Sequence, residues 1–414
     1  MQEYIAVAFC AIGAEKVVSN ELKKLSSINS SGKEPCYSIL ESGFGRVRFK
    51  TNLDGLYRAL FSLRAADRLL LECGNFHAPD FDSLFEGARS IPWESYVKRG
   101  MGLKVAKVRS GASRLNAETS IQAVVHKAAA QKLCDQYHIQ RLPEDAAPAE
   151  LRVFLEKDKA SVLLDISGDP LFKRGYRPGG GIAPLRESTA AAIMLFSGWK
   201  RKFPLYDPFC GSGTIIIEAA LYAWDQAPGL GRDFAISGLA IADKTAEETM
   251  RKELTEKIDY SRPVCIRGSD ADEKTIALAK ANLHRAQAFA GNKSKGVEFS
   301  CIDFKDAAPV KQATSAKLAT TALLATSAKP ATSAAPMPGH IITNPPYGIR
   351  IGETEEAEAR YTEMAALGKA FSGWKLALIC NHKGFESHFG RKADSCRAIK
   401  GGVVDTWLYQ YDKL

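Results

Sequence analysis

The second half of the chain alternates short apolar segments with helix-like segments, and this alternation restricts the fold more than any other feature. The apolar segments read FPLYDP, VCIRGSD, VEFSCID, HIITNPP and WKLALIC, and a helix-like segment follows each of the first three. Continuous apolar strands are buried on both faces, which requires helices on both sides of a mostly parallel sheet. The sequence therefore predicts a Rossmann-like α/β domain over residues 186–414.

Two further segments belong to this predicted domain. The terminal VVDTWLYQYD alternates polar and apolar residues, so we expect an antiparallel strand at the edge of the sheet. Residues 307–338 contain ATSAK twice and ATSAA once, with almost no large apolar side chains. A low-complexity tract of this composition predicts a flexible insertion.

The first half of the chain is organised differently. Up to about residue 165, strands such as IAVAF and GRVRFK alternate with helices such as AEKVVSNELKKL, and LRVFLEKD and ASVLLDISG form two strands joined by a tight turn. This order predicts two small α+β units instead of a doubly wound sheet. Residues 169–185 are rich in Gly and Pro, which indicates a linker between the two halves.

The first strand of the predicted α/β domain ends in an acid and a glycine-rich turn. Asp207 is followed by Pro208, Phe209, Cys210, Gly211, Ser212 and Gly213. Glycines at a strand-to-helix turn let the backbone approach a ligand closely, but neither GxxxxGK nor GxGxxG is present. Because an acid repels phosphate, Asp207 suits a cationic amino group instead.

The next three strands also end in polar or aromatic side chains, namely Asp270, Asp303 with Phe304, and Asn344-Pro345-Pro346-Tyr347. An acid at the second strand end is placed to bind ribose hydroxyls. The third pair suits an adenine amino group and its ring. The last motif offers an amide oxygen, free carbonyls and a flat face, which suit the exocyclic amine of a stacked base.

Each of these residues alone is more often structural: a helix cap, a turn acid or a strand terminator. Four such ends in order along one sheet are less easily explained in that way. The carboxyl edge of a parallel sheet is where α/β proteins bind ligands. We therefore expect one ligand site at this edge.

Basic residues gather in the first half of the chain. The net charge is +9, and residues 95–117 contain no acid. The candidate contacts to a polyanion are Arg46, Arg48, Lys98, Arg99, Lys104, Lys107, Arg109, Arg114, Lys173, Arg174 and Arg177. Each phosphate contact releases counterions, so such a cluster favours a nucleic acid.

Other site types are not predicted. Nine cysteines form no CxxC pair, which indicates a reducing cytoplasm and no disulfide framework. His382 and His388 lie near Cys380 and Cys396, but the spacing is poor for zinc, so we expect no metal. The first 20 residues do not read as a signal peptide, and no apolar run approaches the ~20 residues of a membrane span.

The motifs together resemble a known family. ISGDPLFKRGYR, APLRESTAAAI, DPFCGSGTIIIEAA, GSDAD and NPPYGIR are similar to the class I S-adenosylmethionine-dependent methyltransferases that carry a THUMP module and modify guanine N2 in large-subunit (23S) ribosomal RNA. The resemblance implies a ferredoxin-like domain over 1–65, an RNA-binding THUMP domain over 66–168 and a methyltransferase domain over 186–414. It also implies that Arg186, Glu187, Ser188 and Thr189 line the cofactor pocket.

Two alternatives stay open. NPPY is shared with adenine-N6 methyltransferases. The first alternative is therefore an enzyme that methylates adenine N6 in DNA or RNA. A different class is an RNA-binding THUMP protein whose methyltransferase fold is inactive, although the intact strand-end residues speak against it. Cofactor binding separates the second alternative from an enzyme.

Overall fold

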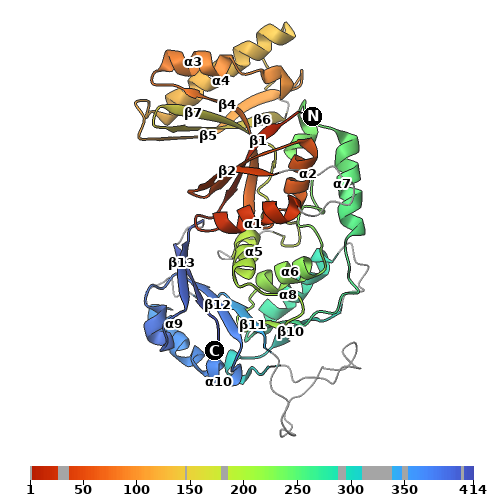
Figure 1. Ribbon diagram of the computed structural model, residues 1–414, viewed down its shortest axis with the longest axis vertical. Coiled ribbons are helices and arrows are strands. Elements are labelled where there is room, and N and C mark those ends of the chain that lie inside the picture. Colours follow the sequence, from red (N-terminus) through yellow and green to blue (C-terminus); the bar gives the residue numbers. More distant parts are fainter. Residues whose placement is uncertain are drawn as a thin grey trace.

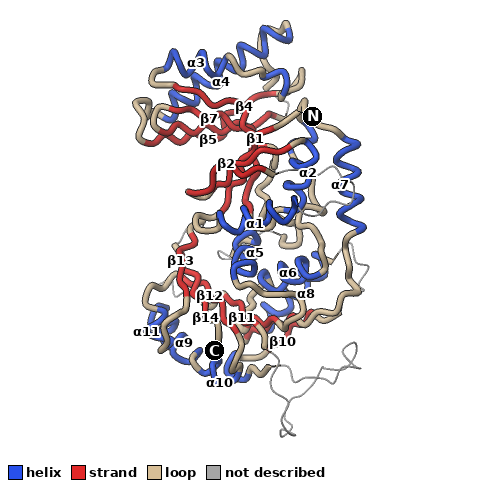
Figure 2. Tube along the Cα trace, viewed as in Figure 1, coloured by secondary structure: helices blue, strands red, loops and turns tan. Residues whose placement is uncertain are grey.

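The computed structural model describes residues 2–26, 37–144, 147–178, 185–287, 295–309, 338–346, 353–401 and 405–414. These described residues form two seven-stranded sheets, one in each half, with helices packed on them (Figures 1 and 2). The predicted insertion 307–338 lies outside the described residues except at its ends. Within the described ranges, no helix has both the length and the apolar character needed to cross a bilayer.

The first sheet has the strand order β2-β3-β1-β4-β7-β6-β5. Its strands are β1 (Tyr4–Cys10), β2 (Ser38–Gly43), β3 (Arg46–Thr51), β4 (Ala66–His77), β5 (Gly102–Gly111), β6 (Pro148–Glu156) and β7 (Lys159–Asp165). The helices are α1 (Glu15–Ser26), α2 (Leu53–Ser62), α3 (Phe81–Arg89) and α4 (Glu118–Tyr137), with a short 3₁₀ turn at Trp93–Ser95. Only β5 and β6 pair in parallel.

The strand β4 joins the two units that the sequence predicts in this half. It has 12 residues and pairs with β1 on one side and β7 on the other. The predicted boundary between residues 65 and 66 therefore falls directly before the strand that both units share. Each unit has the expected mixture of strands and helices, but one continuous sheet connects them.

The second sheet has the order β10-β9-β8-β11-β12-β14-β13, which confirms the Rossmann-like prediction. Its strands are β8 (Leu205–Asp207), β9 (Ile266–Asp270), β10 (Val297–Cys301), β11 (His340–Thr343), β12 (Lys375–Cys380), β13 (Ser395–Ile399) and β14 (Thr406–Tyr411). The first five run in parallel. The strand β14 is antiparallel as expected, but it lies inside the sheet, because β13 pairs on its outer side and forms the edge.

Helices cover both faces of this sheet because its central strands are apolar throughout. Along β11, Ile342 packs into the core that includes α5 and α6, whereas Ile341 packs into a second core with Tyr361 of α9. The helices are α5 (Glu187–Phe196), α6 (Thr214–Ala223), α7 (Lys244–Glu256), α8 (Glu273–Ala286), α9 (Glu353–Met364), α10 (Ala366–Ala370) and α11 (Phe385–Phe389). Two 3₁₀ turns lie at Ala235–Gly238 and Phe304–Asp306.

Buried charges connect the two halves. Arg174 comes from the predicted linker, and its side chain is 3% exposed beside Glu218 of α6, which is fully buried. The Glu218 carboxylate also accepts a hydrogen bond from Tyr176 at 3.0 Å. Arg174 donates to the carbonyl of Arg64, and Arg64 in turn donates to the carbonyl of Gln226 at 2.6 Å. These bonds cross from the end of α2 to the α/β domain.

The helix α7 makes a second connection, because it lies alongside α2 of the first half (Figure 1). Arg58 of α2 forms a two-pronged ion pair with Glu253 of α7, with contacts of 2.8 and 3.2 Å. The Tyr57 hydroxyl accepts a hydrogen bond from the backbone of Asp243 at 3.0 Å. The two halves therefore share a packed and hydrogen-bonded junction.

We expect Glu218→Ala to lower the free energy of unfolding by about 3–5 kcal/mol, because it leaves the buried Arg174 guanidinium without its counter-charge. Asp169→Ala is the matched control: it breaks an ion pair with Lys173 in which both side chains are mostly exposed. Such pairs contribute about 0–1 kcal/mol. Urea denaturation followed by circular dichroism measures both, and equal losses would contradict the role of the buried pair.

Candidate active site

The predicted strand-end residues meet at one edge of the second sheet. The strands β10, β9, β8 and β11 are consecutive parallel neighbours, so their carboxyl ends lie side by side. Two bonds link three of these ends directly. Thr343, the last residue of β11, donates its hydroxyl to Asp207 at 2.7 Å. The backbone of Gly211, after β8, donates to Asp270 of β9 at 3.1 Å.

The glycine-rich turn after β8 has a conformation that glycine favours. Gly211 and Gly213 have φ angles of +52° and +84°. A Cβ on Gly213 would lie 2.8 Å from the ring of Phe299, whereas a Cβ on Gly211 would meet nothing within 4 Å. The turn thus packs tightly on one side and faces open space on the other. Asn282 of α8 supports it by donating to the Ser212 carbonyl at 2.9 Å.

Asp207 is the most buried acid of the edge, with 1% of its surface exposed. It accepts hydrogen bonds from the Thr343 hydroxyl and from the Phe209 backbone at 3.1 Å. Burial raises the pKa of this carboxyl to about 7, although the two hydrogen bonds oppose the shift. A nearby cation would favour the charged form, so the surroundings of Asp207 suit a positive group, as the sequence predicts.

Asp270 and Asp303 are more accessible. Asp270 is half-buried and accepts the backbone N–H groups of Gly211 and Asp272, each at 3.1 Å. Asp303 is exposed and caps the 3₁₀ turn by accepting from Lys305 at 2.9 Å. Both carboxylates retain acceptor capacity, because each oxygen can take more than one hydrogen bond.

Phe304 does not present its ring to the edge as the sequence suggests. It is 6% exposed and packs against Phe209, with ring centroids 4.8 Å apart. The two rings belong to the second core, together with Tyr206 and Tyr361. Phe304 therefore supports the glycine-rich turn through its contact with Phe209, and it exposes little surface to a ligand.

The motif after β11 is held by a residue that sequence reasoning missed. Asn344 is half-buried, Pro345 is buried, and the carbonyl of Pro346 accepts the hydroxyl of Tyr361 at 3.1 Å. Tyr361 lies on α9 and is fully buried. Asn344 and Pro345 stay the predicted acceptors of an amine, and Tyr361 holds the Pro346 carbonyl of the same motif. The predicted Tyr347 lies outside the described residues.

The segment 186–189 begins α5, and its polar contacts reach the first half of the chain. Arg186 and Ser188 both bind Asp67 of β4, at 3.4 and 2.5 Å. Glu187 is buried and pairs with Arg177 at 2.8 Å. Thr189 is half-buried. These contacts give Arg186 and Ser188 a role at the junction of the two halves that sequence reasoning did not find.

Six of the predicted basic contacts lie on the surface of the first half. The exposed residues of this group, called the basic surface below, are Lys98, Arg99, Lys104, Lys107, Arg109 and Arg114. Three of them form surface ion pairs with Glu150, Glu118 and Asp158. Such pairs are weak, so they do not prevent contact with phosphate.

Most of the remaining predicted basic residues are buried or paired with acids. Arg174 is wrong as a nucleic-acid contact, because its guanidinium is buried against Glu218. Arg177 is 17% exposed and pairs with Glu187, whereas Lys173 is exposed. Arg46 and Arg48 both form two-pronged ion pairs, with Glu156 and Glu72. Charge alone did not distinguish structural from accessible arginines.

Family comparisons agree with this geometry. Residues 174–316 and 290–410 match the family described as RMKL-like, methyltransferase domain. The chain belongs to this methyltransferase family. Residues 6–70 match the RlmL ferredoxin-like domain, which confirms the ferredoxin-like prediction. The assignment of residues 66–168 to a THUMP domain stays a prediction.

Individual relatives cover almost the whole chain. The putative RNA methyltransferase YpsC of Bacillus subtilis (strain 168) is 33% identical over 99% of this chain and 96% of its own length. A second relative is the ribosomal RNA large subunit methyltransferase K/L of Syntrophotalea carbinolica, which is 30% identical. The matched region covers 97% of this chain but 52% of that relative's length. The crystal structure of a putative methyltransferase, SMU.472, complexed with SAH superposes with a TM-score of 0.83 at 32% identity, covering 100% of this chain and 99% of that one.

The raised pKa of Asp207 predicts a pH-dependent stability. In the unfolded chain, an aspartate has a pKa near 4. In the native state, the pKa of Asp207 is about 7, so its carboxyl binds a proton more tightly than in the unfolded chain. Charging Asp207 therefore costs stability as the pH rises from about 4 to about 7. We expect the stability of Asp207→Asn relative to the wild type to increase by about 3 kcal/mol between pH 5 and pH 8.

Urea denaturation at several pH values measures this difference. Asp303→Asn is the control, because it removes an exposed acid from the same edge. A difference for Asp207→Asn that is constant with pH would mean that Asp207 carries no raised pKa.

Proposed function

We propose that the protein transfers the methyl group of S-adenosylmethionine to the exocyclic N2 of a guanine in large-subunit (23S) ribosomal RNA. The observation that carries the proposal is the alignment of Asp207, Asp270 and Asn344 at neighbouring strand ends of a methyltransferase-family domain. The SAH-bound relative supports the cofactor, because SAH is what S-adenosylmethionine becomes after it gives up its methyl group. The relatives named as RNA and ribosomal RNA methyltransferases support the substrate.

The glycine-rich turn and the two acids fit the cofactor. The open side of the turn at Gly211 lets the ligand approach the backbone. Asp207 binds the α-amino group, since this cation stabilises the charged carboxylate in a buried place. Asp270 accepts the ribose hydroxyls, and Asp303 is available to the adenine amino group. When bound, S-adenosylmethionine supplies a methyl group on a sulfonium, which a neutral amine can attack.

Asn344 and Pro345 bind and orient the target amine. The lone pair of guanine N2 is delocalised into the ring, which makes the nitrogen a poor nucleophile. The Asn344 amide oxygen and the Pro345 carbonyl accept its two N–H bonds, draw the nitrogen toward a tetrahedral geometry and aim the lone pair at the methyl group. Transfer requires the reacting atoms about 3–3.5 Å apart in line. No strong base is needed, because the proton becomes acidic once the bond forms.

The hydrogen bond from Tyr361 to Pro346 keeps this motif in place. Tyr361 is fully buried, so this bond ties α9 to the motif after β11. A paired guanine hides its N2 inside a helix, so the target base must be unpaired or flipped out. Tyr347 then supplies a stacking face for the extruded base.

The basic surface contacts the RNA away from the reacting base. Its exposed lysines and arginines bind phosphates without reading sequence, which positions the substrate. Lys98 and Arg99 are adjacent and exposed, and within the described part of the chain neither forms an ion pair. They are therefore suitable positions at which to test this surface.

We expect Asn344→Ala to lower the single-turnover rate of methyl transfer by about a hundredfold or more. The amide oxygen acts mostly as the nitrogen becomes tetrahedral, so its loss falls on turnover more than on binding. Affinity for S-adenosylmethionine, measured by calorimetry, should stay close to that of the wild type. Asp270→Ala is the matched comparison, because it should instead weaken cofactor binding by about 1–3 kcal/mol.

The product nucleoside decides the target base. Mass spectrometry of a methylated ribosomal RNA fragment should identify N2-methylguanosine. N6-methyladenosine would replace the proposed substrate with an adenine, since the same two acceptors also suit that amine. A normal rate in Asn344→Ala would refute its role for either base, and a wild type without cofactor affinity would favour a binding protein.

We expect the double change Lys98→Ala and Arg99→Ala to weaken binding of a structured ribosomal RNA fragment and to reduce the slope of log affinity against log salt by about 2, roughly one per lost phosphate contact. Lys244→Ala with Lys252→Ala on α7 is the control: it removes the same charge from two lysines that are 90% and 78% exposed. Equal effects of both pairs would mean that net charge alone, rather than the basic surface, governs binding.

A further inference from the structure

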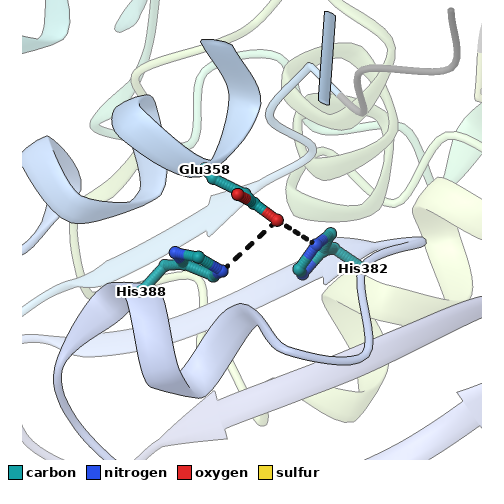
Figure 3. Close-up of side chains that lie close together, drawn as sticks. All are labelled: Glu358, His382 and His388. Carbon is teal, nitrogen blue, oxygen red and sulfur yellow. Dashed lines mark hydrogen bonds and ion pairs between the residues drawn. The ribbon is translucent and has the colours of Figure 1, made fainter. Parts of the chain in front are cut away.

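Three potential metal ligands meet beside β12. Glu358 lies on α9, His382 follows the end of β12, and His388 lies on α11 (Figure 3). Each side chain is partly exposed, at 32%, 21% and 32%. The three come from separate segments, and in Figure 3 the carboxylate points between the two rings.

The distances within this Glu358–His382–His388 cluster suit one ion. An oxygen of Glu358, Oε1, lies 3.0 Å from Nε2 of His382 and 3.4 Å from Nε2 of His388. One potential ligand atom from each residue lies within 4.8 Å of the other two. Bonds of about 2.0–2.1 Å in a tetrahedral zinc site place ligand atoms about 3.3 Å apart. The carboxylate is therefore already at ligand spacing from both imidazoles.

Packing holds both histidines in this arrangement. Their rings meet edge to face, with centroids 5.3 Å apart, and the ring of His382 also contacts that of Tyr361 at 5.8 Å. The backbone carbonyl of His382 accepts the hydroxyl of Tyr409 at 3.1 Å, which fixes the turn after β12. Preformed ligands lose less conformational entropy when the ion binds.

The donor set also indicates the kind of ion. Two imidazole nitrogens and one carboxylate oxygen suit zinc and similar divalent transition metals, whereas magnesium and calcium prefer oxygen ligands alone. The single negative charge of Glu358 offsets part of the charge of a divalent cation. Cys380, which the sequence placed near these histidines, directs its thiol to the carbonyl of His382 at 3.7 Å.

We propose that Glu358, His382 and His388 bind one divalent transition metal, zinc(II) in the cell, with a water molecule as the fourth ligand. This proposal is independent of the proposed substrate and reverses the expectation of no metal. The ion would tie α9 to the turn after β12 and to α11. Because Glu358 lies one helical turn before Tyr361, the ion would also fix the helix that holds Pro346. Its role is structural.

Cobalt(II) is a suitable probe, because its visible absorption reports the ligands. We expect untagged, chelator-treated, full-length protein to bind one cobalt(II) per chain with weak visible bands and without the intense near-ultraviolet absorption of cobalt–thiolate bonds. Zinc(II) should displace the cobalt and raise the melting temperature. The thiolate bands matter because the described residues include eight free cysteines, which are the alternative ligands.

His388→Gln is the main variant, and Glu358→Gln is the second; each should weaken cobalt(II) binding at least about tenfold. His284→Gln on α8 removes an exposed histidine outside the cluster and should bind normally. Melting curves without metal verify that the variants fold. The proposal is overturned if the wild type binds no cobalt(II), if thiolate bands accompany the binding, or if both cluster variants bind like the wild type.

Discussion

The carboxylate of Glu218 has no exposed surface, and its counter-charge comes from Arg174, in the segment before α5. A buried charge without a partner is costly, so α6 and the segment before α5 must stay together. The helix α6 begins directly after Gly213. The same pair that joins the two halves therefore also holds the glycine-rich turn in register with Asp207 and Asp270.

Asp207 is a second buried acid, and its surroundings differ from those of Glu218. Its carboxyl is buried and accepts hydrogen bonds from a hydroxyl and a backbone N–H, and within the described part of the chain no cationic side chain forms an ion pair with it. Without a ligand, the folded protein is therefore less stable when Asp207 is charged than when it is neutral. If the proposed cofactor binds here, its cationic amino group offsets that cost, and the stability of this edge then depends on its occupancy.

Much of the fold and part of the site could be predicted because their signals are local. Apolar runs that end in Asp207, Asp270, Asp303 and Asn344 indicate strands and strand ends within a few residues. Features that depend on distant partners could not be predicted in this way. The order of β13 and β14 is set by pairing, and the burial of Arg174 is set by Glu218, 44 positions along the chain.

The same limit explains the residues that were missed. Tyr361 and Glu358 lie on a polar-looking helix, and nothing in that segment indicates the Pro346 carbonyl or the two histidines that they contact. Phe304 was placed near a ligand because it follows Asp303, but its ring turns into the second core. Spacing in sequence locates a turn, whereas side-chain direction depends on tertiary packing.

The shared strand β4 has a mechanical consequence. Its 12 residues extend about 40 Å, with backbone hydrogen bonds to β1 and β7 along its sides. The strand β4 therefore joins the first unit to β5–β7 through backbone pairing and not through a linker. A polymer bound on β5–β7 would therefore meet the first unit at a fixed spacing, because one continuous sheet carries both.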